Sequence, residues 1–227
     1  MDEESLARAA EGVDFICHTA SPIPMSQPKD ENELVTPAVN GTLGIMRAAR
    51  RNGVKRMVMT SSCASIERYP RDKKTFFTLN ETHWSDPALC NPYYKSKLLA
   101  EKAAWEFIEN LPEGEKINLS VINPYVILGP ALCKGDFTSA KIIIEIMKGN
   151  MPPPKIRIGF VDVRNVATAH MRALERDEAI GQRFILCSET VWFKEFNQIL
   201  KEEYGKDYCV STMQPPKFLM TMVGWFN

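Results

Sequence analysis

Short apolar runs alternate with helix-like segments along this chain, and this alternation constrains the fold more than any other feature. The runs at 13–18, 56–60 and 118–122 are almost continuously apolar, which is typical of strands buried on both faces of a sheet. Segments 33–51 and 93–110 combine apolar residues at helical spacing with strong helix formers. This order predicts a doubly wound α/β fold, in which a parallel sheet lies between two layers of helices.

The rest of the chain predicts smaller elements and one boundary. Met151 precedes three consecutive prolines, which form a rigid connector, so we place a domain boundary after residue 150. This gives a main domain over 1–150 and a smaller portion over 151–227 that is interleaved with the first. The further predicted elements are helices at 5–10, 139–148, 166–176 and 192–204 and a short strand at 183–186.

Charge excludes several classes of partner. The formal net charge is zero, from 28 basic and 28 acidic side chains, so we predict no nucleic acid partner and no attraction to an anionic membrane. No apolar run reaches 18 residues and the acidic N-terminus has no apolar core, so neither a membrane span nor a secretory signal is predicted. The oligomeric state is left open by these patterns. We interpret one basic cluster as a solvated helix end rather than a ligand patch: Arg47, Arg50, Arg51, Lys55 and Arg56.

The six cysteines and three histidines form no metal-ligand pattern. No CxxC pair occurs, and no cysteine stands at ligand spacing from a histidine. Cys17 and Cys187 lie in apolar runs, where a thiol behaves as a small hydrophobic group. We therefore predict a reduced, cytoplasmic protein without a metal site.

Small and polar residues follow three of the predicted strands. His18–Pro22, Ser61–Ser62 and Asn123–Pro124 each come where an apolar run ends. In parallel α/β sheets, ligands lie beyond the carboxyl ends of the strands. We expect these three segments to line one crevice.

Tyr93 and Lys97 form a Tyr-x-x-x-Lys pair at the start of the predicted helix 93–110. On a helix the two side chains share one face, and a nearby cation favours the phenolate and lowers the phenol pKa. Such a phenol can exchange a proton with a carbonyl or alcohol oxygen. The pair alone is more often structural than catalytic. Ser62, at the end of a strand, adds a hydroxyl suited to bind a carbonyl oxygen.

Several stretches together resemble one known family. They are FICHTASPIP, PAVNGTLGIMRAAR, VKRMVMTSSCASI, NETHWSDP, PYYKSKLLAEKAAWEF, INPYVILGP and FVDVRNVATAHMRAL, which span roughly residues 13 to 175. The chain is similar to the extended short-chain dehydrogenases/reductases of the NAD-dependent epimerase/dehydratase superfamily, in the group of dihydroflavonol and cinnamoyl-CoA reductases. The resemblance implies a Rossmann-like fold, with cofactor and catalytic residues in 1–150 and part of the substrate site in 151–227.

The resemblance also implies roles for individual residues. Tyr93 would be the proton donor or acceptor, and Lys97 would bind the nicotinamide ribose and lower the Tyr93 pKa. Ser62 would orient the substrate carbonyl, with Ser61 as its rival. Asn40 resembles a helix residue sometimes assigned to a proton relay. The remaining residues implied to line the cofactor are Thr19, Ala20, Pro124, Tyr125, Val126 and Ile127.

The resemblance implies an NADP(H)-dependent oxidoreductase, with NAD possible, that acts on a small aldehyde or ketone. A nucleotide-sugar epimerase or dehydratase is the alternative with the same fold and the same Tyr-x-x-x-Lys pair. The family's Gly-x-x-Gly-x-x-Gly turn, which holds the pyrophosphate at a helix N-terminus, does not occur in this sequence. We therefore expect the first strands of the sheet to be missing. A non-catalytic remnant is the third interpretation, and we expect the 227-residue chain to be catalytically poor and unstable in isolation.

Overall fold

The computed structural model describes residues 2–23, 28–70, 78–135 and 137–216. By its contacts the chain divides into two units. The first comprises residues 1–124 and 164–186, and the second comprises residues 125–163 and 187–227. The domain boundary expected after residue 150 stays a prediction.

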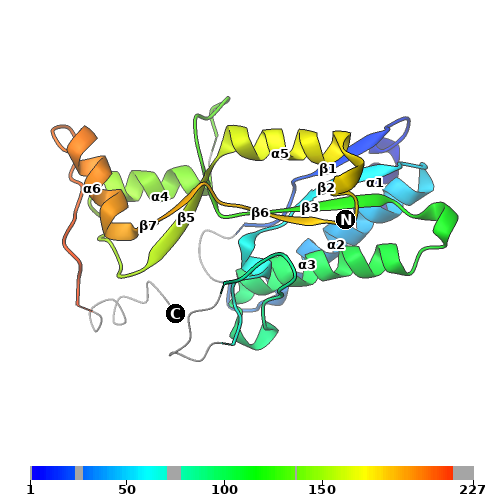
Figure 1. Ribbon diagram of the computed structural model, residues 1–227, viewed down its shortest axis with the longest axis horizontal. Coiled ribbons are helices and arrows are strands. Elements are labelled where there is room, and N and C mark those ends of the chain that lie inside the picture. The colour runs from blue at the N-terminus through cyan, green and yellow to red at the C-terminus, as the bar shows by residue number, and fades with distance from the viewer. Residues whose placement is uncertain (1, 24–27, 71–77, 136, 217–227) are drawn as a thin grey trace. The chain divides into compact units, whose positions relative to one another are not determined.

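The first unit is built on a parallel sheet (Figure 1). Its strands are β1 (Phe15–His18), β2 (Arg56–Thr60), β3 (Asn118–Pro124) and β6 (Arg183–Leu186), in the order β1-β2-β3-β6. All neighbouring pairs in this sheet are parallel. The prediction that the three apolar runs form adjacent parallel strands is confirmed.

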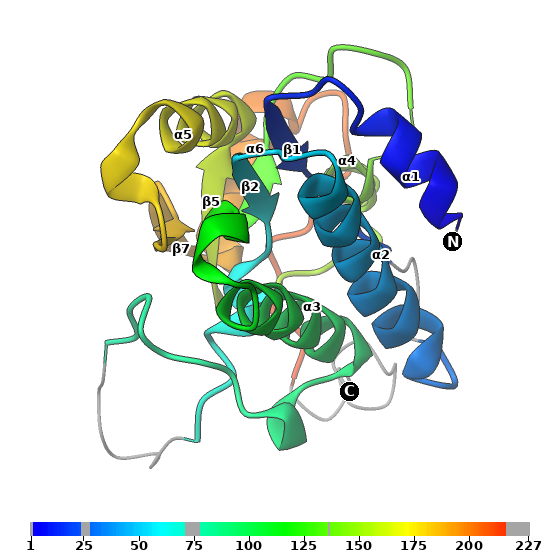
Figure 2. The same ribbon diagram turned by 90° about the vertical axis from the view of Figure 1, so that its right-hand side faces the viewer.

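Helices cover both faces of this sheet, as Figures 1 and 2 show for α2, α3 and α5. Alternate residues of a strand point to opposite faces, so Met57 and Met59 join the core with α2 and α3 while Val58 packs on the α5 side. The doubly wound fold is therefore confirmed. The helices of this unit are α1 (Glu3–Ala9), α2 (Asn32–Arg51), α3 (Pro92–Glu109) and α5 (Val163–Glu175).

Strand β1 departs from the prediction of burial on both faces. Ile16 packs against the α2 and α3 core, but Phe15 is 55% exposed and Cys17 is exposed as well. The core on the other face joins α5 to β2, β3 and β6. The expectation that Cys17 is a buried hydrophobic group is therefore wrong. Apolar composition identifies a strand, but it does not show which strand ends the sheet.

The second unit has a small mixed sheet. Strand β5 (Arg157–Asp162) pairs in parallel with β4 (Val126–Leu128) and antiparallel with β7 (Glu189–Trp192). The sequence analysis predicted none of these three strands, because runs of three to six residues are too short to show a clear period. Helices α4 (Thr138–Met147) and α6 (Phe193–Tyr204) complete the unit. Within the described ranges, no helix is both long enough and apolar enough to cross a membrane.

Candidate active site

The start of helix α3 is fixed by the two residues that precede Tyr93. Asn91 adopts an extended conformation before the helix, and its side chain accepts a hydrogen bond from Tyr94 N at 2.9 Å. Pro92 occupies the first helical position, which suits its fixed φ and missing N–H. Tyr93 therefore lies in the first turn of α3, with Lys97 one turn further along the same face.

Ser62 lies directly beyond β2, and the structure brings it to Tyr93. Its Oγ accepts a hydrogen bond from Ala64 N at 3.2 Å at the start of a short 3-10 helix, and its side chain lies near enough to the Tyr93 hydroxyl to lower the Tyr93 pKa. Because a hydroxyl has one proton and two lone pairs, Ser62 can accept from Ala64 and still donate. The expected convergence of Ser62 and Tyr93 is observed.

Ser61, the rival of Ser62, is directed elsewhere. Its hydroxyl donates to Glu101 Oε2, and the residue is 3% exposed. A hydroxyl whose only proton is held by a buried carboxylate is a poor donor to a substrate. The geometry therefore favours Ser62 as the group that faces a carbonyl oxygen.

Burial dominates the electrostatics of Tyr93. It raises the Tyr93 pKa above the ordinary value, whereas the nearby Ser62 side chain lowers that pKa. The charges of Cys63 and Glu67 raise it further. Lys97 is not among these causes, so the lowering of the Tyr93 pKa by Lys97 stays a prediction. In the structure the Tyr93 phenol is an uncharged proton donor.

Lys97 is a buried cation, 5% exposed. Burial lowers its pKa to about 8, against the opposing effect of Glu101, which lies one turn along α3. A buried ammonium requires hydrogen-bond acceptors, and the hydroxyls of a ribose are acceptors of this kind. The residues present therefore fit the nicotinamide ribose.

His18 is a neighbour of Lys97, and the sequence analysis gave it a place at the crevice but no chemical role. Burial and the charge of Lys97 lower the His18 pKa to about 4, so this imidazole is neutral at physiological pH. Its Nε2 lies 3.4 Å from Thr42 Oγ1 on α2. The position of His18 at the end of a strand was visible in the sequence, but its burial beside a lysine 79 residues away (97 − 18) was not.

The predicted cofactor-lining residues fall in both units. Thr19 and Ala20 follow β1 and are exposed, at the same edge of the sheet as Ser62. Pro124 ends β3 and is buried, whereas the three residues after it belong to the second unit: Tyr125, then Val126 and Ile127 in β4. Asn40 is exposed on α2. Contact of these residues with a cofactor stays a prediction.

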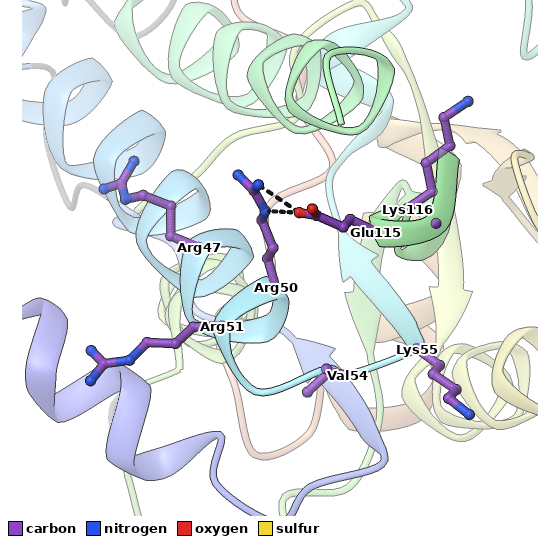
Figure 3. Close-up of a pocket in the computed structure, with 9 residues that line it drawn as sticks. Arg47, Arg50, Arg51, Val54, Lys55, Glu115 and Lys116 are labelled. Carbon is purple, nitrogen blue, oxygen red and sulfur yellow. Dashed lines mark hydrogen bonds and ion pairs between the residues drawn. The ribbon is translucent and has the colours of Figure 1, made fainter. Parts of the chain in front are cut away.

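The basic cluster lies at the opposite, amino-terminal edge of the same sheet, beside a surface hollow (Figure 3). Arg47 pairs with Glu3 at 2.5 Å and Arg51 pairs with Glu4 at 2.8 Å, so both side chains join α2 to α1. Figure 3 shows Arg50 paired with Glu115. These side chains are about half exposed, in keeping with a solvated helix end.

Arg56 was wrongly included in that solvated cluster. It begins β2 and is only 8% exposed. Its guanidinium pairs with Asp177 at 3.1 Å and donates to the Arg176 carbonyl. Arg56 therefore ties β2 to the segment after α5, which the sequence could not show because the partners lie about 120 residues away.

Comparison with known proteins identifies the family. Residues 1–213 match the model of the 3-beta hydroxysteroid dehydrogenase/isomerase family. The chain belongs to this family. The expected resemblance to extended short-chain dehydrogenases/reductases is confirmed by relatives that include Cinnamoyl-CoA reductase 1 of Petunia hybrida, which is 38% identical over 93% of this chain and 62% of its own length.

A second relative is the NADPH-dependent methylglyoxal reductase GRE2 of Saccharomyces cerevisiae, 33% identical over 85% of this chain and 61% of its own length. The crystal structure of this yeast methylglyoxal/isovaleraldehyde reductase complexed with NADPH superposes with a TM-score of 0.80 and 30% identity. It covers 95% of this chain, which corresponds to 68% of the yeast chain. The present chain thus spans about three fifths of the length of these curated relatives.

Proposed function

We propose that this chain carries the catalytic residues of an NADPH-dependent reductase of small aldehydes or ketones, which oxidises the corresponding alcohol in reverse. The observation that carries the proposal is the proximity of the Ser62 side chain to the Tyr93 hydroxyl, with the buried Lys97 one turn further along α3. The printed names of the yeast and petunia relatives, a methylglyoxal reductase and a cinnamoyl-CoA reductase, support this reaction class.

Tyr93 and Ser62 act on the carbonyl oxygen in this proposal. The nicotinamide, when bound, supplies the hydride for the carbonyl carbon. Tyr93 gives its hydroxyl proton to the carbonyl oxygen, which general acid catalysis favours. Ser62 donates a hydrogen bond to the same oxygen and stabilises the charge that develops on it. In the direction of alcohol oxidation, Tyr93 takes the proton back.

Lys97 and the strand ends bind the cofactor in this proposal. Lys97 would donate to the ribose hydroxyls, while Thr19, Ala20 and Pro124 to Ile127 would line the cofactor. NADPH is the first candidate because the yeast relative is NADPH-dependent by name, and NADH is the second. A cytoplasmic location stays a prediction.

Calorimetry and turnover test this proposal together. We expect the 227-residue chain to bind NADPH more tightly than NADH and to consume NADPH only slowly with a panel of small aldehydes, in keeping with the poor catalysis expected from its sequence. Absence of NADPH binding together with absence of turnover would contradict the proposal. A thermal-shift panel of UDP and GDP nucleotides covers the alternative of a sugar-nucleotide epimerase or dehydratase, for which we expect no stabilisation.

A partner-binding protein without catalysis is the second candidate. A Gly-x-x-Gly-x-x-Gly turn, which would hold the cofactor pyrophosphate, does not occur in these 227 residues. The two candidates predict opposite results in the same titration. Clear micromolar binding of NADPH excludes the second, and a cooperative fold without any NADPH binding excludes the first.

A further inference from the structure

Glu101 is a fully buried carboxylate on α3 that the mechanism above does not use. Its Oε1 accepts a hydrogen bond from Arg183 Nε at 2.6 Å. Its Oε2 accepts from the Ser61 hydroxyl, from the Ser65 hydroxyl at 2.6 Å and from Asn123 Nδ2 at 2.9 Å. An ionised carboxylate has acceptors only, so this convergence of donors suits the charged form.

The donors around Glu101 also hold the main chain of Ser62. Ser61 and Ser65 stand before and after this serine, and both hydroxyls point to Glu101. The Ser62 carbonyl accepts from Asn123 Nδ2 and from Ser65 N, each at 3.1 Å. The loop that presents Ser62 is therefore bound to one carboxylate through both of its flanks.

The same carboxylate belongs to the helix that carries the catalytic phenol. Tyr93, Lys97 and Glu101 follow one another at intervals of four residues, so they share one face of α3. Because Glu101 links α3 to the Ser62 loop, it limits how far the Ser62 hydroxyl can move from the Tyr93 hydroxyl.

Arg183 binds Oε1 of Glu101, whereas the two serines bind Oε2. Its Nη1 donates to the carbonyls of Glu81 and His83, each at 2.7 Å. Its guanidinium lies 3.7 Å from the centroid of the Trp84 ring, a cation–π arrangement. The side chains of Arg183 and Glu101 are 8% and 0% exposed. A buried pair of this kind holds its geometry, because breaking it leaves an uncompensated charge.

We propose that Glu101, anchored by Arg183, is the positioning residue for Ser62: it sets the separation between the Ser62 hydroxyl and Tyr93. This inference rests on the function proposed above, because it assigns Ser62 and Tyr93 to the same carbonyl oxygen. Glu101 touches neither substrate nor cofactor, and it acts only through the serine loop and α3.

Glu101→Gln tests the proposal with little change in side-chain size. The glutamine amide places a donor among side chains that already donate, so the Ser61–Ser65 loop loses its fixed position. We expect kcat of the folded enzyme to fall by about 10², the effect of a misplacement of about 1 Å. The Kd for NADPH, measured well below the pKa of Lys97 because Glu101 raises that pKa, should stay within about threefold. A loosened contact with Ser62 also raises the Tyr93 pKa, because Ser62 is the group that lowers this pKa in the parent.

Two further variants separate positioning from loss of stability. Met46→Ala removes a fully buried side chain of α2 outside the network, and we expect a lower Tm with an unchanged kcat for the folded protein. The double variant Glu101→Gln/Arg183→Met also removes the guanidinium of Arg183, which Glu101→Gln alone leaves without its carboxylate partner. We expect this double variant to recover stability but not kcat, because the serine loop still lacks its acceptor.

The phenolate absorbance of Tyr93 provides a readout without substrate or cofactor, measured as the difference between each protein and its Tyr93→Phe counterpart. A higher titration midpoint in Glu101→Gln supports the positioning role even if no protein turns over aldehydes, an outcome that would contradict only the proposed function. An unchanged midpoint, or a kcat within threefold of the parent, would overturn the positioning role.

Discussion

At the scale of single residues, the candidate site places an uncharged phenol near a serine hydroxyl, with a buried lysine one turn further along the same helix. Burial raises the pKa of Tyr93 and lowers that of Lys97 to about 8. Both shifts disfavour the charged form of the side chain. The Tyr93 hydroxyl is therefore protonated at neutral pH. This arrangement suits carbonyl reduction, in which the phenol gives a proton away.

Tyr93→Phe should remove most of the turnover and leave cofactor binding intact. Phenylalanine keeps the ring and loses only the hydroxyl, and general acid catalysis is worth on the order of 10² to 10⁴ in rate. Steady-state kinetics with NADPH and an aldehyde, together with a calorimetric Kd, measure the two effects. Tyr94→Phe is the matched control, because its hydroxyl binds Glu67 and we expect it to keep most of the turnover. Turnover of Tyr93→Phe within a few-fold of the parent would show that Tyr93 is not the acid.

Lys97→Met should stabilise the fold at neutral pH while it weakens NADPH binding and turnover. The pKa of Lys97 falls from 10.5 to about 8 on folding, a difference of 2.5 units, which corresponds to about 3 kcal/mol. Between these two values the unfolded state binds more protons, so the parent gains stability as pH rises. Below pH 8 both states are charged and the cost of burial is complete.

The free energy of unfolding, measured by urea denaturation across pH, checks this sign. We expect Lys97→Met to be more stable than the parent by up to about 3 kcal/mol at pH 7, with the gain lost by about pH 10.5. Lys95→Met on the same helix is the control, because Lys95 forms a partly exposed pair with Glu31 worth at most about 1 kcal/mol. A pH-independent difference between parent and Lys97→Met would contradict the burial of a cation at this position.

At the scale of elements, the start of α3 is the feature on which the site depends. The side chain of Asn91 accepts from Tyr94 N, and Pro92 opens the helix. This cap sets the first turn, which contains Tyr93. A frayed first turn would move the phenol relative to Ser62.

Asn91→Ala should therefore cost both stability and rate. Removal of an N-cap acceptor typically lowers the free energy of unfolding by about 1 kcal/mol, and we expect a several-fold loss of kcat from the less ordered Tyr93. Asn91→Asp keeps an acceptor at the same position and should restore both quantities. Equal stability of the alanine and aspartate variants in thermal denaturation would show that the cap does not hold α3.

At the scale of the whole molecule, β1 is the strand of the sheet that is least covered by other elements. It is the terminal strand in the order β1-β2-β3-β6, and Phe15 and Cys17 are exposed on one of its faces. An exposed apolar end strand is a template for pairing with another chain. We therefore expect this chain to associate with itself through β1.

Phe15→Thr should reduce that association without loss of stability. Threonine keeps a high strand propensity, and an exposed side chain contributes within about 0.5 kcal/mol to the free energy of unfolding. Sedimentation velocity at several concentrations measures the association. Leu132→Thr removes another exposed apolar side chain, which lies outside any strand, and should leave association unchanged. Equal association of the parent and Phe15→Thr would exclude the β1 edge as the site.

Local periodicity in the sequence determined the parallel strands β1 to β3, the helices around them and the pairing of Tyr93 with Lys97. These features depend on residues within one strand or one turn of helix, whose spacing is visible in the chain. The carboxyl ends of parallel strands share one edge, so the convergence of Ser62 with the start of α3 could also be predicted. The identity of the family followed from the same local motifs.

Only the tertiary structure decided which of two adjacent serines faces Tyr93, which face of β1 lies open and which basic side chain is buried. Ser61 differs from Ser62 because its proton is bound by Glu101, 40 residues away, and Glu101 is held by Arg183, 82 residues further on. Burial and hydrogen-bond partners depend on segments that are distant in the chain. A local pattern of apolar and polar residues does not predict which hydrogen-bond donor will bind an acceptor that is distant in the chain.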